Sequence, residues 1–343
     1  MGGQPFTPIY QQLKDYYIQR ILSQEYPPGA RIDSIHRMML RHHVSRETAK
    51  LVLRELIREG LIVSIQGKGS FVVPQTVTND QWGMIIPFFS PNMEQLIHYL
   101  DGEAQNRGKQ LHYFLGYNNP EEEKRLVGSM VLEGYEAVVV VPNYDESLTA
   151  DFYRNLIHGH TTVVLVDQTM SGSYFRYVVQ SYDLGIKRAV EYLFSHTSGN
   201  LVMVRNDTWK GRNLLDEFME ETLRNIVTVN YPDRSVHILP NVRAMTKSLI
   251  EQKDIEGILT TTDSDAIRVL GRLKSWGVHV PSKARLVNYG NTELTKFCSP
   301  AITAIDCLYG EMARKTALLI DLGQGAGAYE LHVIQPELVI RET

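Results

Sequence analysis

The chain has 343 residues, which is too long for one small core and suits a small domain joined to a larger one. Its hydrophobic fraction of 43% and charged fraction of 22% exclude a disordered chain, and no apolar run is long enough to cross a membrane. The two cysteines, Cys298 and Cys307, form no Cys/His cluster, and no secretory leader is evident. We therefore expect no metal site and a cytoplasmic location.

The net charge of −4 is unevenly distributed along the chain. Residues 1–75 contain ten Lys or Arg and six Asp or Glu, whereas the remaining residues contain 25 and 33. A basic head on an acidic body favours contact between the head and a polyanion such as DNA. The charge alone fits a merely solvated surface equally well.

Three helices are predicted in the head. The first opens at Pro8 and ends before Pro27-Pro28-Gly29, a run that cannot continue a helix. Ser34 and Ser45 stand where helix caps are expected, ahead of a short second helix and of a third helix from Arg46 to about Glu59. The apolar spacing predicts that the first and third helices turn these side chains inward: Ile9, Leu13, Tyr17, Ile21, Ala49, Val52, Leu53, Leu56 and Ile57.

Two short strands, Leu61–Ile65 and Ser70–Val73, follow the third helix and flank Gln66-Gly67-Lys68-Gly69. The glycines of this turn can take positive φ and let the backbone approach another molecule closely. A helix-turn-helix followed by such a hairpin is a winged helix. We therefore predict a DNA-binding domain over residues 1–74 and a linker over residues 75–80.

Four segments of the head match a known pattern: Pro8-Ile-Tyr-Gln-Gln-Leu13, Val44-Ser-Arg-Glu-Thr-Ala-Lys50, Leu53–Ile62 and Gly67–Val72. Through them, residues 8–73 resemble the DNA-binding domain of the GntR family. The resemblance implies that the third helix reads the major groove and that the wing reaches the minor groove. It implies these DNA contacts: Ser34, His36, Ser45, Arg46, Thr48, Lys50, Lys68 and Gly69.

The head departs from the family at one point. The family usually has Leu-Pro-Ser-Glu-Arg where this chain has Ile32-Asp-Ser-Ile-His36, so a DNA contact at His36 becomes weaker or sensitive to pH. Arg54 and Arg58, further along the third helix, read more simply as a solvated or ion-paired face.

Beyond residue 80, short apolar runs alternate with helical stretches such as Met93–Arg107, Leu184–His196 and Asp263–Trp276. Strands buried on both faces and separated by crossover helices predict an α/β fold with doubly wound parallel sheets. Eight runs are more than one such sheet usually holds, so we expect two lobes with a cleft between them. The predicted strands are Trp82–Ile86, Leu111–Leu115, Ala137–Val141, Thr162–Val166, Leu201–Val204, Val236–Leu239, Gly257–Thr260 and Ala284–Val287.

The effector domain is predicted over residues 81–343. The first lobe is expected at about residues 81–170 and 304–328, and the second at about residues 171–303 and 329–343. The sequence holds no nucleophile elbow, no P-loop, no HExxH and no dinucleotide-binding glycine motif after a strand. We therefore expect a protein that is not an enzyme and needs no cofactor; an enzyme with a DNA-binding head is the rival reading.

Several segments of the body carry a second resemblance: Val164–Asp167, Val179–Gly185, Glu256–Asp263, Leu273–Pro281, Arg285–Asn291 and Ser299–Ile305. Residues 81–343 resemble the effector domain shared by LacI-type regulators and periplasmic sugar-binding proteins. A GntR head on this body resembles the arabinose-repressor branch of the GntR family.

This resemblance implies a sugar site at the carboxyl ends of the strands. Asp167 would accept hydrogen bonds from hydroxyl groups, Arg212 would donate a planar fork, and Trp209 would cover an apolar sugar face. Asp263 is a second acceptor, with a helix N-cap as its alternative role, and Asp183 reads more readily as a cap. The other expected effector contacts are Phe88, Ser90, Asn143 and Asn291.

Two departures put the identity of the sugar in doubt. The family usually has Gly-Tyr-Asp where this chain has Asn288-Tyr-Gly290, so an expected aspartate is missing, and Asn291 is the candidate substitute. Leu215 stands where the family has a glycine.

Together these features predict a bacterial transcription regulator. We expect a homodimeric repressor that leaves its DNA operator when a monosaccharide, pentose or deoxyhexose-like, closes the lobes. The alternative keeps this architecture and replaces the sugar by a purine or an amino acid.

Overall fold

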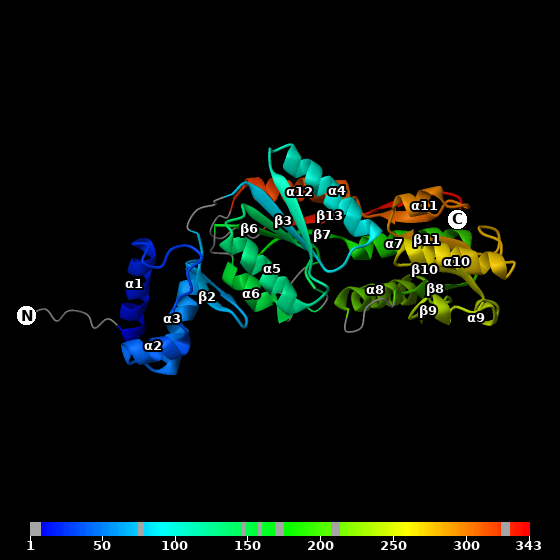
Figure 1. The fold of residues 1–343 in the computed structure, drawn as a ribbon. Helices are drawn as coiled ribbons and strands as arrows, with labels where there is room; N and C mark the ends of the chain where they lie inside the picture. The colour runs from blue at the N-terminus through cyan, green and yellow to red at the C-terminus, as the bar shows by residue number, and fades with distance from the viewer. Residues whose placement is uncertain are drawn as a thin grey trace, which may run out of the picture. The chain divides into compact units, whose positions relative to one another are not determined.

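The computed structural model describes residues 8–74, 79–143, 145, 148–156, 160–168, 175–206, 213–323 and 330–343. The chain divides into two compact units (Figure 1). Unit 1 comprises Met1–Phe89, Leu100–Val178 and Ala313–Leu331, and unit 2 comprises Ser90–Tyr99, Val179–Met312 and His332–Thr343. No described helix is both long enough and apolar enough to cross a membrane.

The head is the predicted winged helix. It consists of α1 (Ile9–Leu22), α2 (Ile35–His42), α3 (Arg46–Arg58) and an antiparallel hairpin of β1 (Ile62–Ile65) and β2 (Gly69–Val72). Most residues of the predicted apolar stripes are buried in its core, and three are not. Ile9 is 58% exposed because it is the first residue of α1, and Leu53 and Ile57 are only partly buried. The buried core is formed by Leu13, Tyr17, Ile21, Ile32, Met38, Ala49, Val52, Leu56, Leu61, Ile62 and Val72.

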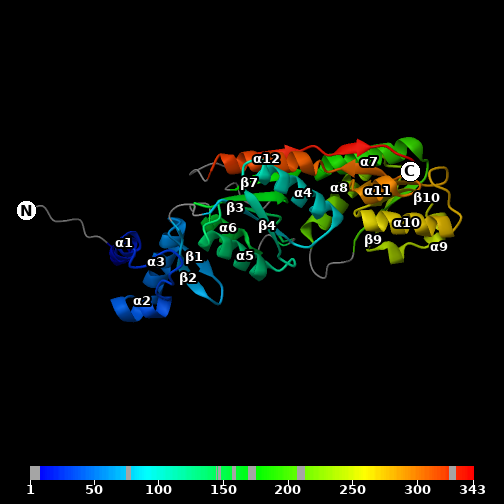
Figure 2. The same cartoon turned by 45° about the horizontal axis from the view of Figure 1, so that its top comes forward.

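Unit 1 also holds a six-stranded sheet in the order β13-β7-β6-β5-β3-β4. Where the pairing of β3 with β4, β3 with β5 and β5 with β6 is described, it is parallel. Helices α5 (Pro120–Leu132) and α6 (Ala150–Leu156) cover one face, and α12 (Tyr309–Asp321) lies on the other (Figures 1 and 2). The strands are β3 (Gln81–Ile86), β4 (Gln110–Leu115), β5 (Ala137–Val140), β6 (Thr162–Asp167), β7 (Arg176–Gln180) and β13 (Glu330–Ile334).

Unit 2 is built on a second six-stranded sheet in the order β14-β12-β11-β10-β8-β9. All its pairs are parallel except β12 with β14. The strands are β8 (Asn200–Val204), β9 (Val236–Leu239), β10 (Ile255–Thr260), β11 (Arg285–Tyr289), β12 (Thr303–Asp306) and β14 (Glu337–Val339). The unit includes the start of α12 and all or part of these helices: α4 (Pro91–Gln105), α7 (Tyr182–His196), α8 (Leu214–Asn230), η2 (Val242–Ala244), α9 (Lys247–Gln252), α10 (Asp263–Ser275) and α11 (Glu293–Phe297).

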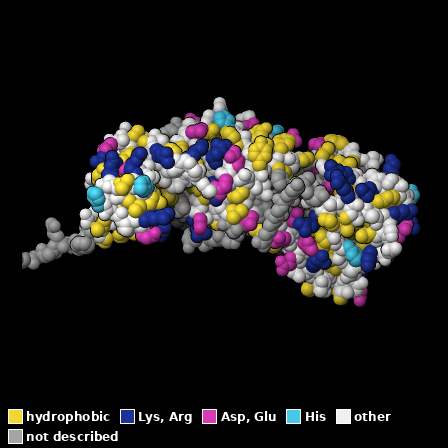
Figure 3. Space-filling view, turned by 60° about the horizontal axis from the view of Figure 1, so that its bottom comes forward, with side chains coloured by type: hydrophobic (Ala, Val, Ile, Leu, Met, Phe, Trp, Pro, Cys, Tyr) yellow, Lys and Arg dark blue, Asp and Glu magenta, His cyan; other side chains and the backbone are white. Residues whose placement is uncertain are grey.

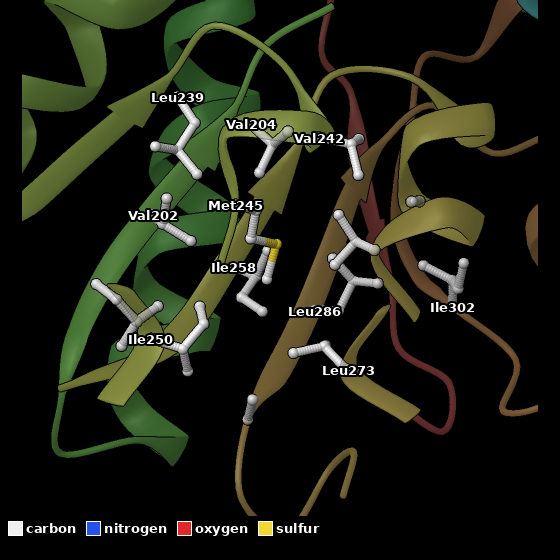
Figure 4. Close-up of a cluster of buried hydrophobic side chains, with 14 residues drawn as sticks. Val202, Val204, Leu239, Val242, Met245, Ile250, Ile258, Leu273, Leu286 and Ile302 are labelled. Atoms are coloured by element: carbon white, nitrogen blue, oxygen red, sulfur yellow. The ribbon is translucent and has the colours of Figure 1, made fainter. Parts of the chain in front are cut away.

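One core cluster of unit 2 lies on the sheet face next to α9 and α10. Figure 4 shows Val202, Ile258 and Leu286, from three neighbouring strands, together with Leu273 of α10 and Ile250 of α9. Burying such aliphatic side chains contributes roughly 1.5–3 kcal/mol each. The cluster therefore fixes β10 and β11, the two strands after which Asp263 and Asn291 follow.

The parallel α/β architecture with a winged-helix head confirms the predicted fold class. All eight predicted strands are present, with ends shifted by at most a few residues. Four described strands were not predicted, because they are short or carry polar residues: β7, β12, β13 and β14. The predicted lobe boundaries stay a prediction; between the compact units, the chain crosses after Phe89, Tyr99, Val178, Met312 and Leu331.

Candidate DNA-binding surface and effector site

The N-terminal turn of α3 presents one free cation. Ser45 is the N-cap: its Oγ accepts the Thr48 N–H at 3.1 Å and lies 2.8 Å from Thr48 Oγ1. Lys50 Nζ is 2.9 Å from Glu47 Oε1. Arg46 is exposed and has no hydrogen bond or ion pair with another described residue. Of the four residues predicted to contact DNA here, Ser45 caps the helix by accepting from Thr48, and Lys50 is ion-paired with Glu47. Arg46 is the one left available for a base or a phosphate.

The wing turn behaves as its glycines predict. Gly67 and Gly69 have φ values of 73° and 114°, and Lys68 between them is exposed. A Cβ at Gly69 would lie 2.6 Å from Nε of Arg31, so this glycine lets the Arg31 guanidinium approach the wing. Arg31 is a cation at the wing that the sequence did not single out. Figure 3 shows Lys, Arg and His side chains on the face of the head that is in view.

The second helix is held by a buried carboxylate. Asp33, where the family has proline, is 4% exposed and accepts hydrogen bonds from Tyr17 Oη at 2.9 Å and from Arg41 Nη1 at 2.8 Å. Burial, reinforced by this carboxylate, raises the pKa of the Tyr17 hydroxyl. Ser34 Oγ accepts the Arg37 N–H at 3.2 Å and so caps α2, and His36 is exposed in its first turn. Asp33 therefore ties α1 to α2, and Ser34 orders α2.

Asp167 is the last residue of β6 and is 6% exposed. Its φ of 68° lies in the left-handed region, which residues other than glycine seldom occupy. Such outliers cluster at functional sites, where the surrounding structure holds them in place. The carboxyl end of a parallel strand is also where α/β folds bind ligands.

Asn143 follows β5 and is held by a buried glutamate of α5. The Asn143 N–H and the Tyr153 hydroxyl each donate a hydrogen bond to Glu123, at 2.7 Å to different oxygens. Glu123 is 2% exposed, and burial raises its pKa to about 7. Glu123 gave no sequence signal, because it ends a run of three glutamates that resembles a solvated helix face.

The segment after β3 carries two predicted residues with different surroundings. Phe88 is half-buried, and Ser90 Oγ accepts the Met93 N–H at 3.2 Å in the first turn of α4. Ser90 therefore has a helix-capping role in this structure. Trp209 and Arg212 lie outside the described residues.

Asp263 is buried in unit 2, with 3% exposure. The N-cap of α10 is Thr262, and Asp263 Oδ1 accepts the Thr292 N–H at 3.3 Å, which holds the loop after β11. Desolvation raises the pKa of Asp263. Asp183 lies in the first turn of α7, exposed, and accepts a 2.6 Å hydrogen bond from Ser181 Oγ.

Asn291 is 9% exposed, and both ends of its amide are hydrogen-bonded. Its Nδ2 donates to Asp306 Oδ2 at 2.7 Å, and its Oδ1 accepts from Arg341 Nη2. A Cβ at Gly290 would lie 3.0 Å from Asp263 Oδ2 and 3.1 Å from the side chain of Asn92. Gly290, at the position of the family's aspartate, therefore leaves room for Asp263 and Asn92.

Asn92 is a candidate effector residue that the sequence did not suggest. Its Oδ1 is buried and has no hydrogen-bond partner among the described residues. A buried polar atom without a partner is costly unless a ligand or water satisfies it. Among the residues that the structure describes, no three His, Cys, Asp or Glu side chains are grouped as a metal site.

Two regions of the chain match known families. Residues 9–72 match the family described as bacterial regulatory proteins, gntR family, and residues 190–343 match the periplasmic binding protein-like domain. The chain is 21% identical to the arabinose metabolism transcriptional repressor of Halalkalibacterium halodurans, over 98% of this chain and 95% of that protein. It is 24% identical to the transcriptional regulator GalR of Salmonella typhimurium, over 75% of each chain.

Solved structures of LacI-type regulators share the fold of the body. A periplasmic binding protein/LacI transcriptional regulator from Alkaliphilus metalliredigens, complexed with D-xylulofuranose, superposes with a TM-score of 0.64 at 16% identity, over 77% of this chain and 99% of that one. The trehalose repressor from Escherichia coli gives 0.62 at 16% identity, over 76% and 100%. Residues 9–72 thus match the gntR family of bacterial regulatory proteins, residues 190–343 match the periplasmic binding protein-like domain, and the body shares its fold with LacI-type regulators.

Proposed function

We propose that this protein is a transcriptional repressor whose affinity for operator DNA falls when a small neutral sugar binds its effector domain. Residues 1–74 bind DNA, residues 75–80 link, and residues 81–343 bind the effector. The proposal is supported by an exposed cation at the start of α3, Arg46, and by relatives whose names describe repressors of sugar metabolism.

On the DNA side, Arg46 donates to a base edge in the major groove, and Lys68 with Gly69 meets the minor groove. The hydrogen bonds between Ser45 and Thr48 order the first turn of this helix. His36 and Lys50 contact phosphates, because Lys50 is a point charge at the helix surface and His36 is exposed.

On the effector side, the observation that carries the proposal is Asp167. A buried carboxylate held in a rare backbone conformation at a strand end is arranged to accept hydrogen bonds from hydroxyl groups. A neutral pentose or deoxyhexose fits such an acceptor better than an anion does. Independently of Asp167, the buried Oδ1 of Asn92 in unit 2 is an acceptor without a hydrogen-bond partner among the described residues.

We further propose that the repressor is a homodimer, since a two-fold protein matches a palindromic operator. The edge strand β4 exposes Tyr113 at 50% and Phe114 at 36%. An edge strand with exposed apolar side chains offers unpaired backbone groups and apolar surface to another chain. Light scattering should give twice the chain mass for the wild type and a lower mass for the Tyr113→Lys/Phe114→Lys variant. A wild-type mass equal to that of one chain would contradict the proposed dimer.

A thermal-shift screen of pentoses, deoxyhexoses, purines and amino acids tests the effector class. At 100 times its dissociation constant, a true effector stabilises the protein by about 2.7 kcal/mol. Asp167→Asn keeps a residue type that tolerates positive φ and removes the charge, so it should lose the sugar stabilisation and still bind DNA. Asp183→Asn, an exposed aspartate of α7, is the matched control.

If a purine or an amino acid stabilises the wild type and no sugar does, the effector class is wrong. If Asp167→Asn keeps the full sugar stabilisation, the site is wrong.

A further inference from the structure

Unit 2 has a cavity on the flank of α10 that none of the predicted site residues lines. Its volume is about 520 Å³, within the usual range for small-molecule sites. It lies between α10 and η2, and its polar lining consists of Arg243, Arg268, Arg272, Asn241, Asp265 and Ser275.

The lining is strongly cationic. Three of these six side chains are guanidinium groups, and Asp265 is the one carboxylate among them. This unbalanced charge is unexpected in a body whose acidic residues outnumber its basic ones, 33 to 25 after residue 75.

The single carboxylate is already satisfied. Asp265 is 4% exposed, and its Oδ2 accepts hydrogen bonds from Asn206 Nδ2 at 2.8 Å and from Thr262 Oγ1 at 2.7 Å. Its Oδ1 lies 3.2 Å from Nη1 of Arg268. Arg243 and Arg272 form no ion pair with any carboxylate in the described part of the chain. Two of the three cations therefore lack a counter-ion.

One of the arginines is held in place before any ligand arrives. Arg272 is half-buried, its Nη1 donates to the Met245 carbonyl at 3.0 Å, and its guanidinium carbon lies 5.9 Å from the Trp276 ring centroid. A guanidinium fixed in this way loses little side-chain entropy on binding an oxyanion. Arg268, 66% exposed at its side chain, can swing from Asp265 toward the same ligand.

We propose that this cavity binds the phosphate monoester group of a small metabolite, at a site separate from the neutral sugar. Guanidinium forks match the oxygen geometry of phosphate, and charge-assisted hydrogen bonds are about twice as strong as neutral ones. Three guanidinium groups neutralise a phosphate dianion, and the Ser275 and Asn241 side chains in the lining are polar neighbours for the rest of the metabolite. The volume admits a phosphorylated sugar.

Calorimetry on the full-length protein at low salt tests the site, with inorganic phosphate, a hexose 6-phosphate and the free hexose as probes. The Arg243→Ser/Arg268→Ser double variant removes two charges at exposed positions and leaves Arg272 with its packing intact. Lys253→Ser/Lys274→Ser removes two exposed charges of the same unit outside the cavity. We expect both phosphate probes to bind the wild type, at least tenfold weaker binding to the arginine variant, and less than a twofold change in the lysine variant.

Phosphate probes that do not bind the wild type, or that bind the arginine and lysine variants equally, would overturn the proposal. The proposal would also be overturned if the wild type bound no phosphate and the arginine variant had a lower mass in light scattering. The arginines would then contact a second copy of the chain. The test is independent of the effector proposal: Asp167→Asn should bind the hexose phosphate as the wild type does, whichever compound occupies the effector site.

Discussion

The DNA-binding head and the effector domain present their candidate residues in opposite ways. Arg46, His36 and Lys68 in the head are exposed, whereas Asp167, Asp263 and Asn291 in the body are at most 9% exposed. Exposed cations suit a polyanion that brings its own solvent and counter-ions. Buried polar groups suit a small ligand, since hydrogen bonds to them are stronger away from water than at an exposed surface.

Salt gives the largest expected contrast between the two regions. If Arg31, Lys50 and Lys68 each neutralise a phosphate in both protomers of the proposed dimer, operator affinity should fall roughly 1,000-fold between 50 and 200 mM salt. The affinity for a neutral sugar should change less than twofold. Fluorescence anisotropy measures operator binding and calorimetry measures sugar binding over the same salt series. Equal salt dependence of both affinities would contradict the difference proposed between head and body.

Replacing the one unpaired cation at the start of α3 comes next. Arg46→Ala should weaken operator binding by about 1–3 kcal/mol and relax specificity at one base pair. Arg58→Ala, which breaks only the ion pair with Glu55 at the other end of α3, should change binding little. Gel shifts with operator and mutated operator distinguish the two, and equal losses would mean that Arg46 contributes only charge.

The buried carboxylate behind Asn143 should make the stability of unit 1 depend on pH. Because folding raises the pKa of Glu123 to about 7, its stabilising effect is complete below about pH 4.5 and is lost as pH rises through 7. Between pH 5 and 8, the wild type should lose on the order of 2 kcal/mol relative to Glu123→Gln.

Urea unfolding across this pH range measures the effect of Glu123. Glu121→Gln, exposed on the same helix, is the control and should show the wild-type pH profile. A constant difference between the wild type and Glu123→Gln at every pH would show that Glu123 does not titrate in this window.

The smallest effect is expected at the cap of the recognition helix. Ser45→Ala removes the acceptor for the Thr48 N–H and should destabilise the head by about 1 kcal/mol. Operator binding should weaken in proportion, since Thr48 also loses its hydroxyl partner. Ser23→Ala, at the end of α1, is the control in thermal unfolding. Equal losses of stability in the two variants would show that the Ser45 cap does not contribute specifically.

Much of the fold could be predicted because local signals agree with each other. Ser34 and Ser45 cap the helices they precede, and Gly67 and Gly69 adopt the positive φ that the wing requires. Strands such as β5 are buried along their whole length, so they appear as continuous apolar runs. β7 and β14 escaped prediction because they are short and have polar residues at their ends.

The candidate effector site was less predictable, since its chemistry depends on contacts between distant segments. Asn291 stays the predicted substitute for the missing aspartate, and only the folded chain shows that Asp306 and Arg341 bond its amide. Asn92 comes close to Gly290 although 198 positions separate them, and no local pattern indicates such a contact. Glu123 and Arg31 acquire their surroundings only in the folded chain.

The central claim is that ligand binding to the effector domain changes the affinity of the head for DNA. The most direct measurement titrates the full-length protein, bound to an operator selected from random DNA, with the sugar found in the thermal screen. We predict a 5- to 150-fold fall in operator affinity, corresponding to a coupling of about 1–3 kcal/mol, and no fall for Asp167→Asn. A sugar that stabilises the protein fully yet leaves operator affinity unchanged would contradict the account.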